Sequence, residues 1–217
     1  MTQAFIKNEQ FNYMKKQLNM LKDTSKRTTD SSVLQAVKEM TMDKILSLFP
    51  HADSEQSSML QLDDTYSDLH IEKYLERLTH YVIRFPEVSE KDIQKLFPKV
   101  KKLKFPDYNE YHLQRTTYLS WSDISTNKRY LLFEREGELI GVECKFTMVN
   151  RDNMCSFCNS HSQVTFLSAI TKAKNPSNPD YYKAIGHYVC FDPHLCNSRI
   201  SGTQYLDSFI DEYLKVQ

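Results

Sequence analysis

Four cysteines in two close pairs constrain the fold of this chain more than any other feature of its sequence. Two residues separate Cys155 from Cys158, and five separate Cys190 from Cys196. In a reduced chain, a C-x2-C pair followed by a second close pair is typical of a zinc site, because four thiolates can surround Zn²⁺ tetrahedrally at roughly 2.3 Å. We therefore expect these four residues to hold one structural Zn²⁺ ion.

The ligand set has alternatives. His194 could replace Cys196, since it lies close enough to Cys190, but four thiolates make the closed site typical of structural zinc. A redox-active pair fits less well because no thioredoxin-like βαβ pattern surrounds it, and unrelated buried cysteines are a third interpretation. Cys144 falls in an expected strand and is assigned to the core. Four protein ligands leave no position for water, which argues against catalytic zinc.

The composition excludes several classes of function. Lys+Arg and Asp+Glu are both 28, and the basic excess of a general nucleic-acid binder is missing. Only 4 glycines occur, with no phosphate-binding glycine loop and no HExxH or GxSxG motif. No apolar run approaches the roughly 20 residues of a membrane span, and no signal-like segment opens the sequence. We expect a cytoplasmic protein without enzymatic activity, membrane partner or small-molecule substrate.

The first half reads as a set of helices. Apolar residues recur at helical spacing from Phe11 to Leu21, from Val33 to Phe49 and from Ile71 to Val82. Asp30, Ser31 or Ser32 can cap the second of these, Pro50 ends it, and Ser67 can cap the third. Ser89 with Asp92 resembles a capping box for a short helix. Each segment has one apolar stripe to bury, which predicts a helical bundle domain over residues 1–98.

The pattern changes after Pro98 to runs of aromatic and β-branched residues. Strands are expected at 118–121, 129–133, 138–146, 164–167 and 187–189, with Glu136 and Gly137 in a hairpin turn. A last helix follows Ser201, and Trp121 is assigned to the core. The expected fold class is therefore α+β: a helical bundle, then a small domain over residues 99–217 with a treble-clef-like four-cysteine zinc finger.

Several segments resemble a known family. Met154–Asn159, Tyr188–Asp192 and Cys196–Asn197 resemble the treble-clef C-terminal domain of elongation-factor-G-binding proteins, and 121–123 and 128–131 resemble the strand region of that domain. With its helical first half and its length, the chain is similar over nearly its whole extent to fusidic-acid-resistance proteins of the FusB type.

The resemblance implies a function that composition alone does not show. Such proteins bind elongation factor G, the GTPase of translocation, which fusidic acid traps with GDP on the ribosome. The family promotes release of the trapped factor without altering the drug. The implied partner is elongation factor G, bound one to one, with the ribosome involved indirectly.

The resemblance also suggests contact residues. The family's contact surface lies around the zinc knuckle and the final helix, and matching positions here are Met154, Lys183, Tyr188 and Phe209. Family members can carry an aromatic residue where Met154 stands, and a lysine where Ile185 stands. For Tyr188 and Phe209 the alternative is burial in the core.

Two other classes of function compete with this interpretation. A zinc-containing ribosome- or RNA-binding module could use the basic run Lys99–Lys104, which is otherwise a solvated face. An enzyme could use the cysteine cluster for redox chemistry or hydrolysis, and firm zinc retention without thiol reactivity would exclude it.

Overall fold

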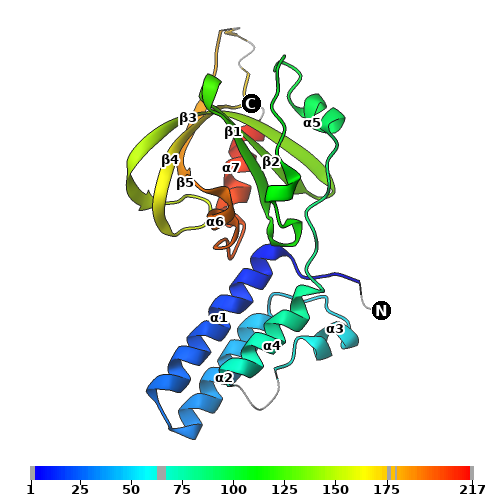
Figure 1. Ribbon diagram of the computed structural model, residues 1–217, viewed down its shortest axis with the longest axis vertical. Helices are drawn as coiled ribbons and strands as arrows, with labels where there is room; N and C mark the ends of the chain where they lie inside the picture. The colour runs from blue at the N-terminus through cyan, green and yellow to red at the C-terminus, as the bar shows by residue number, and fades with distance from the viewer. Residues whose placement is uncertain (1–2, 63–66, 175–176, 179, 216–217) are drawn as a thin grey trace. The chain divides into compact units, whose positions relative to one another are not determined.

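The protein consists of two compact units, Met1–Ile83 and Arg84–Gln217 (Figure 1). The computed structural model describes residues 3–62, 67–174, 177–178 and 180–215. Within these ranges no helix has both the length and the apolar character needed to cross a bilayer. The first unit is helical and the second is built on an antiparallel sheet, as the α+β expectation required.

The first unit contains α1 (Asn8–Arg27), α2 (Ser31–Leu46), α3 (Ser54–Met59) and α4 (Asp68–Thr79). The carboxylate of Asp30 accepts hydrogen bonds from the backbone N–H groups of Ser32 and Val33, which identifies Asp30 as the N-cap of α2. The helix ends at Leu46, before Pro50. The buried stripe expected for this helix starts later than Val33, because the Val33 side chain is 43% exposed.

The core of the first unit lies between α1, α2 and α4. Its fully buried side chains include Met14 and Leu18 of α1, Ile45 of α2 and Leu78 of α4. The Tyr74 hydroxyl donates to the carbonyl oxygen of Leu60 at 2.7 Å, which satisfies a buried polar group. The helical bundle expected from the apolar stripes is confirmed.

The second unit is a five-stranded antiparallel meander in the order β1-β2-β3-β4-β5. Its strands are β1 (Tyr118–Asp123), β2 (Lys128–Arg135), β3 (Glu138–Met154), β4 (His161–Ile170) and β5 (Ala184–Cys190). Glu136 and Gly137 form the expected two-residue turn between β2 and β3. Both have positive φ, 55° and 83°, as a hairpin turn with the right twist requires.

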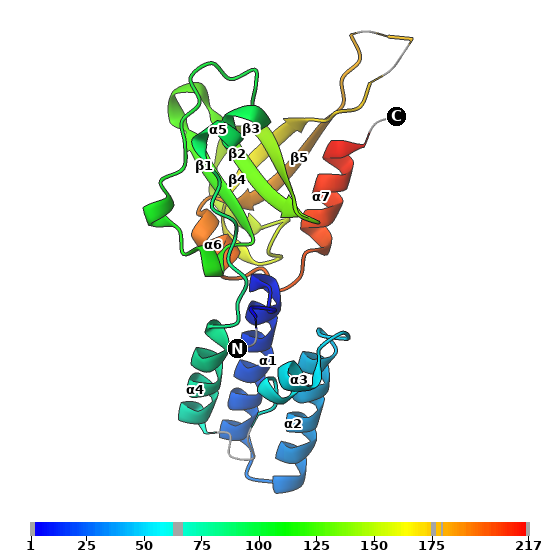
Figure 2. The same ribbon diagram turned by 90° about the vertical axis from the view of Figure 1, so that its right-hand side faces the viewer.

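Helices pack on both faces of this sheet (Figure 2). One face carries α7 (Gln204–Leu214), whose Leu206, Phe209 and Ile210 join the largest core cluster. The other face carries α5 (Glu90–Leu96) over the β1–β3 part of the sheet, with Trp121 in this second cluster as expected. A short helix, α6 (Pro193–Asn197), follows β5 directly and precedes the last helix, α7.

The division between the units falls after Ile83, well before the boundary expected at residue 98. The difference comes from α5, which was expected to belong to the helical bundle but lies in the second unit. Ser89 caps it as the sequence suggested, with its hydroxyl accepting from the N–H of Asp92, but its apolar stripe packs on the sheet. Gly141 of β3 permits this approach: a Cβ atom there would lie 2.9 Å from Leu96 and from Phe97.

Candidate metal centre and partner surface

The four paired cysteines converge on one point in the second unit. All four sulfur atoms lie within 4.8 Å of one another, and all four side chains are buried. Cys155 Sγ lies 3.7 Å from Cys196 Sγ, and Cys158 Sγ lies 3.6 Å from Cys190 Sγ. A tetrahedral ion bound at about 2.3 Å to each sulfur would separate the sulfurs by about 3.8 Å. The residues present therefore fit a tetrahedral metal of the zinc class.

Local backbone geometry aims each pair at this point. After β3 the chain turns back through Cys155 and Cys158, with Asn159 N–H donating to the Cys155 carbonyl at 2.9 Å and Asn159 at φ 50°. Cys190 is the last residue of β5. The Asp192 carboxylate then caps α6 by accepting from the His194 N–H at 2.8 Å, and α6 brings Cys196 to the cluster.

The sulfurs also receive hydrogen bonds from outside the cluster. Backbone N–H groups of Phe157 and Cys190 donate to Cys155 Sγ at 3.4 and 3.3 Å, and the Ser162 hydroxyl lies 3.0 Å from Cys190 Sγ. Donors directed at a sulfur favour the thiolate, which is the form that binds metal.

Arg129 places a buried positive charge beside the cluster. Its side chain is 5% exposed, and its guanidinium donates to the carbonyl oxygens of Cys190 and Phe191, the first at 3.2 Å. A divalent ion with four thiolates carries a net charge of −2, so a nearby guanidinium offsets part of that charge. Sequence reasoning missed this residue because Arg129 lies in a strand far from the cysteines in the chain.

Asn197, next to Cys196, joins α6 to β1. Its Oδ1 accepts from the N–H groups of Thr117 and Tyr118 at 2.7 and 3.1 Å, and its Nδ2 donates to the carbonyls of Tyr118 and Pro193. The side chain is 2% exposed. This amide fixes the helix that carries the fourth sulfur. Its position in the resembling segment Cys196–Asn197 was the available signal, but its contacts with β1 could not be expected from the sequence alone.

The structure separates the alternatives for the fourth ligand. Cys196 lies in the sulfur cluster, whereas His194 is exposed and its ring packs against Tyr111 with centroids 4.7 Å apart. Cys144 is 1% exposed within the apolar core, where burial raises the pKa of its thiol to about 12. Its expected core position is confirmed.

The four residues suggested as partner contacts fall into two groups. Met154 is 42% exposed at the end of β3. Tyr188 is half-buried on β5, with its ring 5.3 Å from that of Phe166 across the strand pair. The Lys183 ammonium pairs with the Glu212 carboxylate of α7 at 3.0 Å, and both side chains are 40% exposed. These three residues can be reached from solvent.

Phe209 belongs to the core, and the suggestion that it contacts a partner needs correction. Its side chain is 2% exposed, and its ring packs against the rings of Phe133, Phe157 and His187 with centroid separations of 5.2–6.1 Å. Phe209 lies on the apolar stripe of α7 that anchors this helix to the sheet, as the alternative of burial in the core required. A partner has no access to the ring in this structure.

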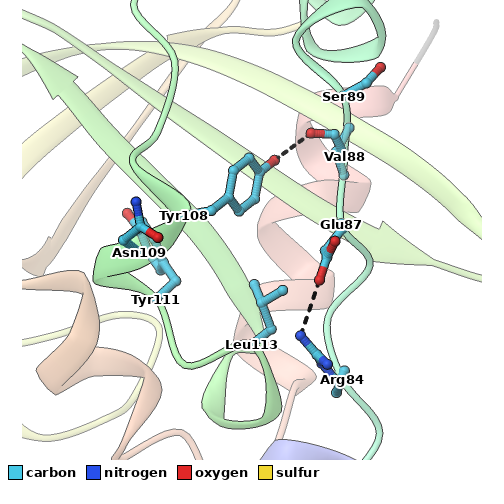
Figure 3. Close-up of a pocket in the computed structure, with 8 residues that line it drawn as sticks. All are labelled: Arg84, Glu87, Val88, Ser89, Tyr108, Asn109, Tyr111 and Leu113. Carbon is cyan, nitrogen blue, oxygen red and sulfur yellow. Dashed lines mark hydrogen bonds and ion pairs between the residues drawn. The ribbon is translucent and has the colours of Figure 1, made fainter.

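A hollow of about 560 Å³ lies beside α5, lined by residues of 84–89 and 108–113 (Figure 3). Its polar groups are engaged within the protein: the Tyr108 hydroxyl donates to the Val88 carbonyl at 2.9 Å, and Arg84 pairs with Glu87 at 3.1 Å. Figure 3 shows these pairs along its wall. We assign no ligand to this hollow.

Comparisons with known proteins cover both units. Residues 5–86 match the family described as elongation factor G-binding protein, N-terminal, and residues 96–211 match the FBP C-terminal treble-clef zinc-finger. The solved structure of the fusidic acid resistance protein FusC is similar, with a TM-score of 0.82 and 26% identity, over 97% of this chain and 98% of the other. No curated protein sequence matches.

Proposed function

Because this chain belongs to the family of elongation-factor-G-binding proteins with a C-terminal treble-clef zinc finger, we propose that it binds elongation factor G and promotes release of the factor from ribosomes stalled by fusidic acid. The observation that carries the proposal is the pair of family matches, which together span most of both units. The likeness to a fusidic acid resistance protein along nearly the whole chain supports the resistance role. The place of action would be the cytoplasm.

The proposal includes one structural zinc ion held by Cys155, Cys158, Cys190 and Cys196. Their sulfur separations and their match to a treble-clef zinc-finger family support it. Zinc would supply folding free energy rather than chemistry, because four thiolates leave no open coordination position. The ion would join β3, β5 and α6, and so fix the surface on which Met154 and Tyr188 lie.

The contact surface for the factor would include Met154, Tyr188 and Lys183, which are exposed or half-buried near the metal centre and α7. Aromatic and methionine side chains are enriched where protein partners bind tightly, and a lysine at the rim can add electrostatic steering. Phe166, packed against Tyr188, would support the tyrosine ring on the same sheet face.

The mechanism we propose is non-enzymatic. A binding protein shifts an equilibrium only by the difference between its affinities for two states. The protein must therefore bind elongation factor G more tightly in a conformation that the drug-locked ribosomal complex disfavours. To shift the equilibrium between bound and released factor a hundredfold, the protein must prefer that conformation by about 2.7 kcal/mol.

A dwell-time experiment tests the proposal. Labelled elongation factor G is trapped on ribosomes with fusidic acid, the zinc-loaded protein is added, and the residence time of the factor is measured. We expect a shorter dwell time and, by mass spectrometry, unchanged drug. Binding to the free factor with an unchanged dwell time would contradict the release step, and modified drug would contradict the non-enzymatic mechanism.

A further inference from the structure

A basic hollow that the proposed function does not use begins on one face of the sheet, near the end of β4. The sheet register sets Lys145 of β3 opposite Ser168 of β4, and Ile170 of β4 opposite Ala184 of β5. Because side chains alternate along a strand, these residues share the face on which Gly141 meets α5. The helix covers this face only over β1–β3, and a hollow of about 910 Å³ begins beyond it and extends past the end of β4 to Tyr213 of α7. We call it the basic hollow.

Four lysines line the basic hollow, namely Lys99, Lys145, Lys172 and Lys174, against one carboxylate. That carboxylate, Glu143, is paired with Lys128 at 2.6 Å and so is largely offset. Among the described residues, no ion pair engages any of the four lysines, and all four are exposed. In a chain whose net charge is zero, this is a local concentration of positive charge that would attract a polyanion.

Tyrosine rings lie among the lysines. Tyr182 is 70% exposed, which is unusual for so large an aromatic side chain, and Tyr181 and Tyr213 line the same hollow. The Lys172 ammonium lies 5.8 Å from the Tyr213 ring centroid, so charge and ring surface are interleaved. Ile170, 62% exposed, adds an apolar floor. Cations beside exposed rings are the combination that binds single-stranded nucleic acid, by phosphate contacts and base stacking.

We propose that the basic hollow binds a single-stranded segment of RNA, with lysine side chains on the phosphates and Tyr182 stacked on a base. An acidic peptide would match the charge but would leave the exposed ring and the apolar floor without partners. The choice of RNA over DNA rests on the proposed function, since a protein that acts on a ribosome-bound factor works beside RNA. Binding of RNA by the hollow needs no elongation factor, so the two proposals can fail separately.

The test measures binding of the full-length, zinc-loaded protein to a fluorescent 12-nucleotide oligo(U) RNA by anisotropy at several salt concentrations. The test variant is Lys99→Glu/Lys145→Glu. The control is Lys15→Glu/Lys16→Glu, which makes the same change in charge on exposed lysines of α1. We expect the test variant to weaken binding at least tenfold and to lower the salt slope by about 1.4, since each phosphate contact on a single strand contributes about 0.7. The control should stay within twofold of the wild type.

Tyr182→Ala separates stacking from charge. Loss of one stacked base should weaken RNA binding by about 5- to 150-fold and leave the salt slope unchanged. Three results would overturn the proposal: no RNA binding at low salt, equal losses in the test and control variants, or displacement of the RNA by oligo-glutamate as effective as displacement by unlabelled oligo(U). Tighter binding of oligo(dT) than of oligo(U) would overturn the assignment to RNA.

Discussion

Asn197→Ala should strongly destabilise the second unit, because this one amide satisfies buried backbone groups of β1 and α6. Its contacts with Tyr118, one to the N–H and one to the carbonyl, are both buried. A buried polar group left without a partner costs about 1–3 kcal/mol, so the two together cost about 2–6 kcal/mol. The contacts to Thr117 and Pro193 are partly exposed, and water can replace them. The loss is large beside a typical domain stability of about 5–15 kcal/mol.

Urea denaturation of the zinc-loaded protein provides the assay. The chain has a single tryptophan, Trp121, which lies in the core of the second unit, so its fluorescence reports on that unit alone. The matched control is Ser198→Ala, an exposed neighbour whose hydroxyl makes one local bond to the Leu195 carbonyl, and it should stay within about 0.5 kcal/mol of the wild type. A transition in Asn197→Ala within 0.5 kcal/mol of the wild type would refute this reasoning.

Three further predictions concern the metal, the packing of α5 and a helix cap. Cys155→Ala should lose zinc and unfold the second unit while far-ultraviolet circular dichroism retains the helices of the first, and a folded, metal-free variant would show that the site is not structural. Gly141→Ala should cost about 1–3 kcal/mol in urea denaturation, since its Cβ would press on Leu96 and Phe97; unchanged stability would contradict the close approach. Hydrogen bonds from Ser32, and from the Val33 N–H, lower the pKa of Asp30, so its stabilising effect is present above pH 4 or so and is lost as the pH falls through the lowered pKa. Asp30→Ala should therefore weaken hydrogen-exchange protection at the start of α2 at pH 7 but not in strong acid, and an equal deficit at both pH values would exclude this cause.

Features set by neighbouring residues were predictable from the sequence. The caps at Asp30 and Ser89 and the turn at Gly137 each depend on residues within three positions, and the structure has all of them. The spacing of the cysteines also predicted that their sulfurs meet at one site, because tetrahedral thiolate coordination restricts how two close pairs can be arranged. This is why the grouping of the four sulfurs could be expected without knowledge of the fold.

Features set by distant partners were not predictable in the same way. The apolar stripe of α5 predicts that one side of the helix is buried, but it does not identify the surface against which that side packs. In the structure this surface is the sheet and not the helical bundle. The same limit applies to Phe209, whose helical spacing fits either a core or an interface until its contacts with Phe133 and Phe157 are known. Arg129 and Asn197 lie in segments that resemble the family, but their contacts span long sequence separations and no local pattern shows them.

The central claim is tested most directly by calorimetric titration of the zinc-loaded protein with purified elongation factor G from a matching bacterial host. We expect a saturable one-to-one isotherm, weakened at least tenfold by Tyr188→Ala and unchanged by Tyr182→Ala, an exposed tyrosine outside the proposed contact surface. No heat and no co-elution with the factor would contradict the proposal that this protein binds elongation factor G.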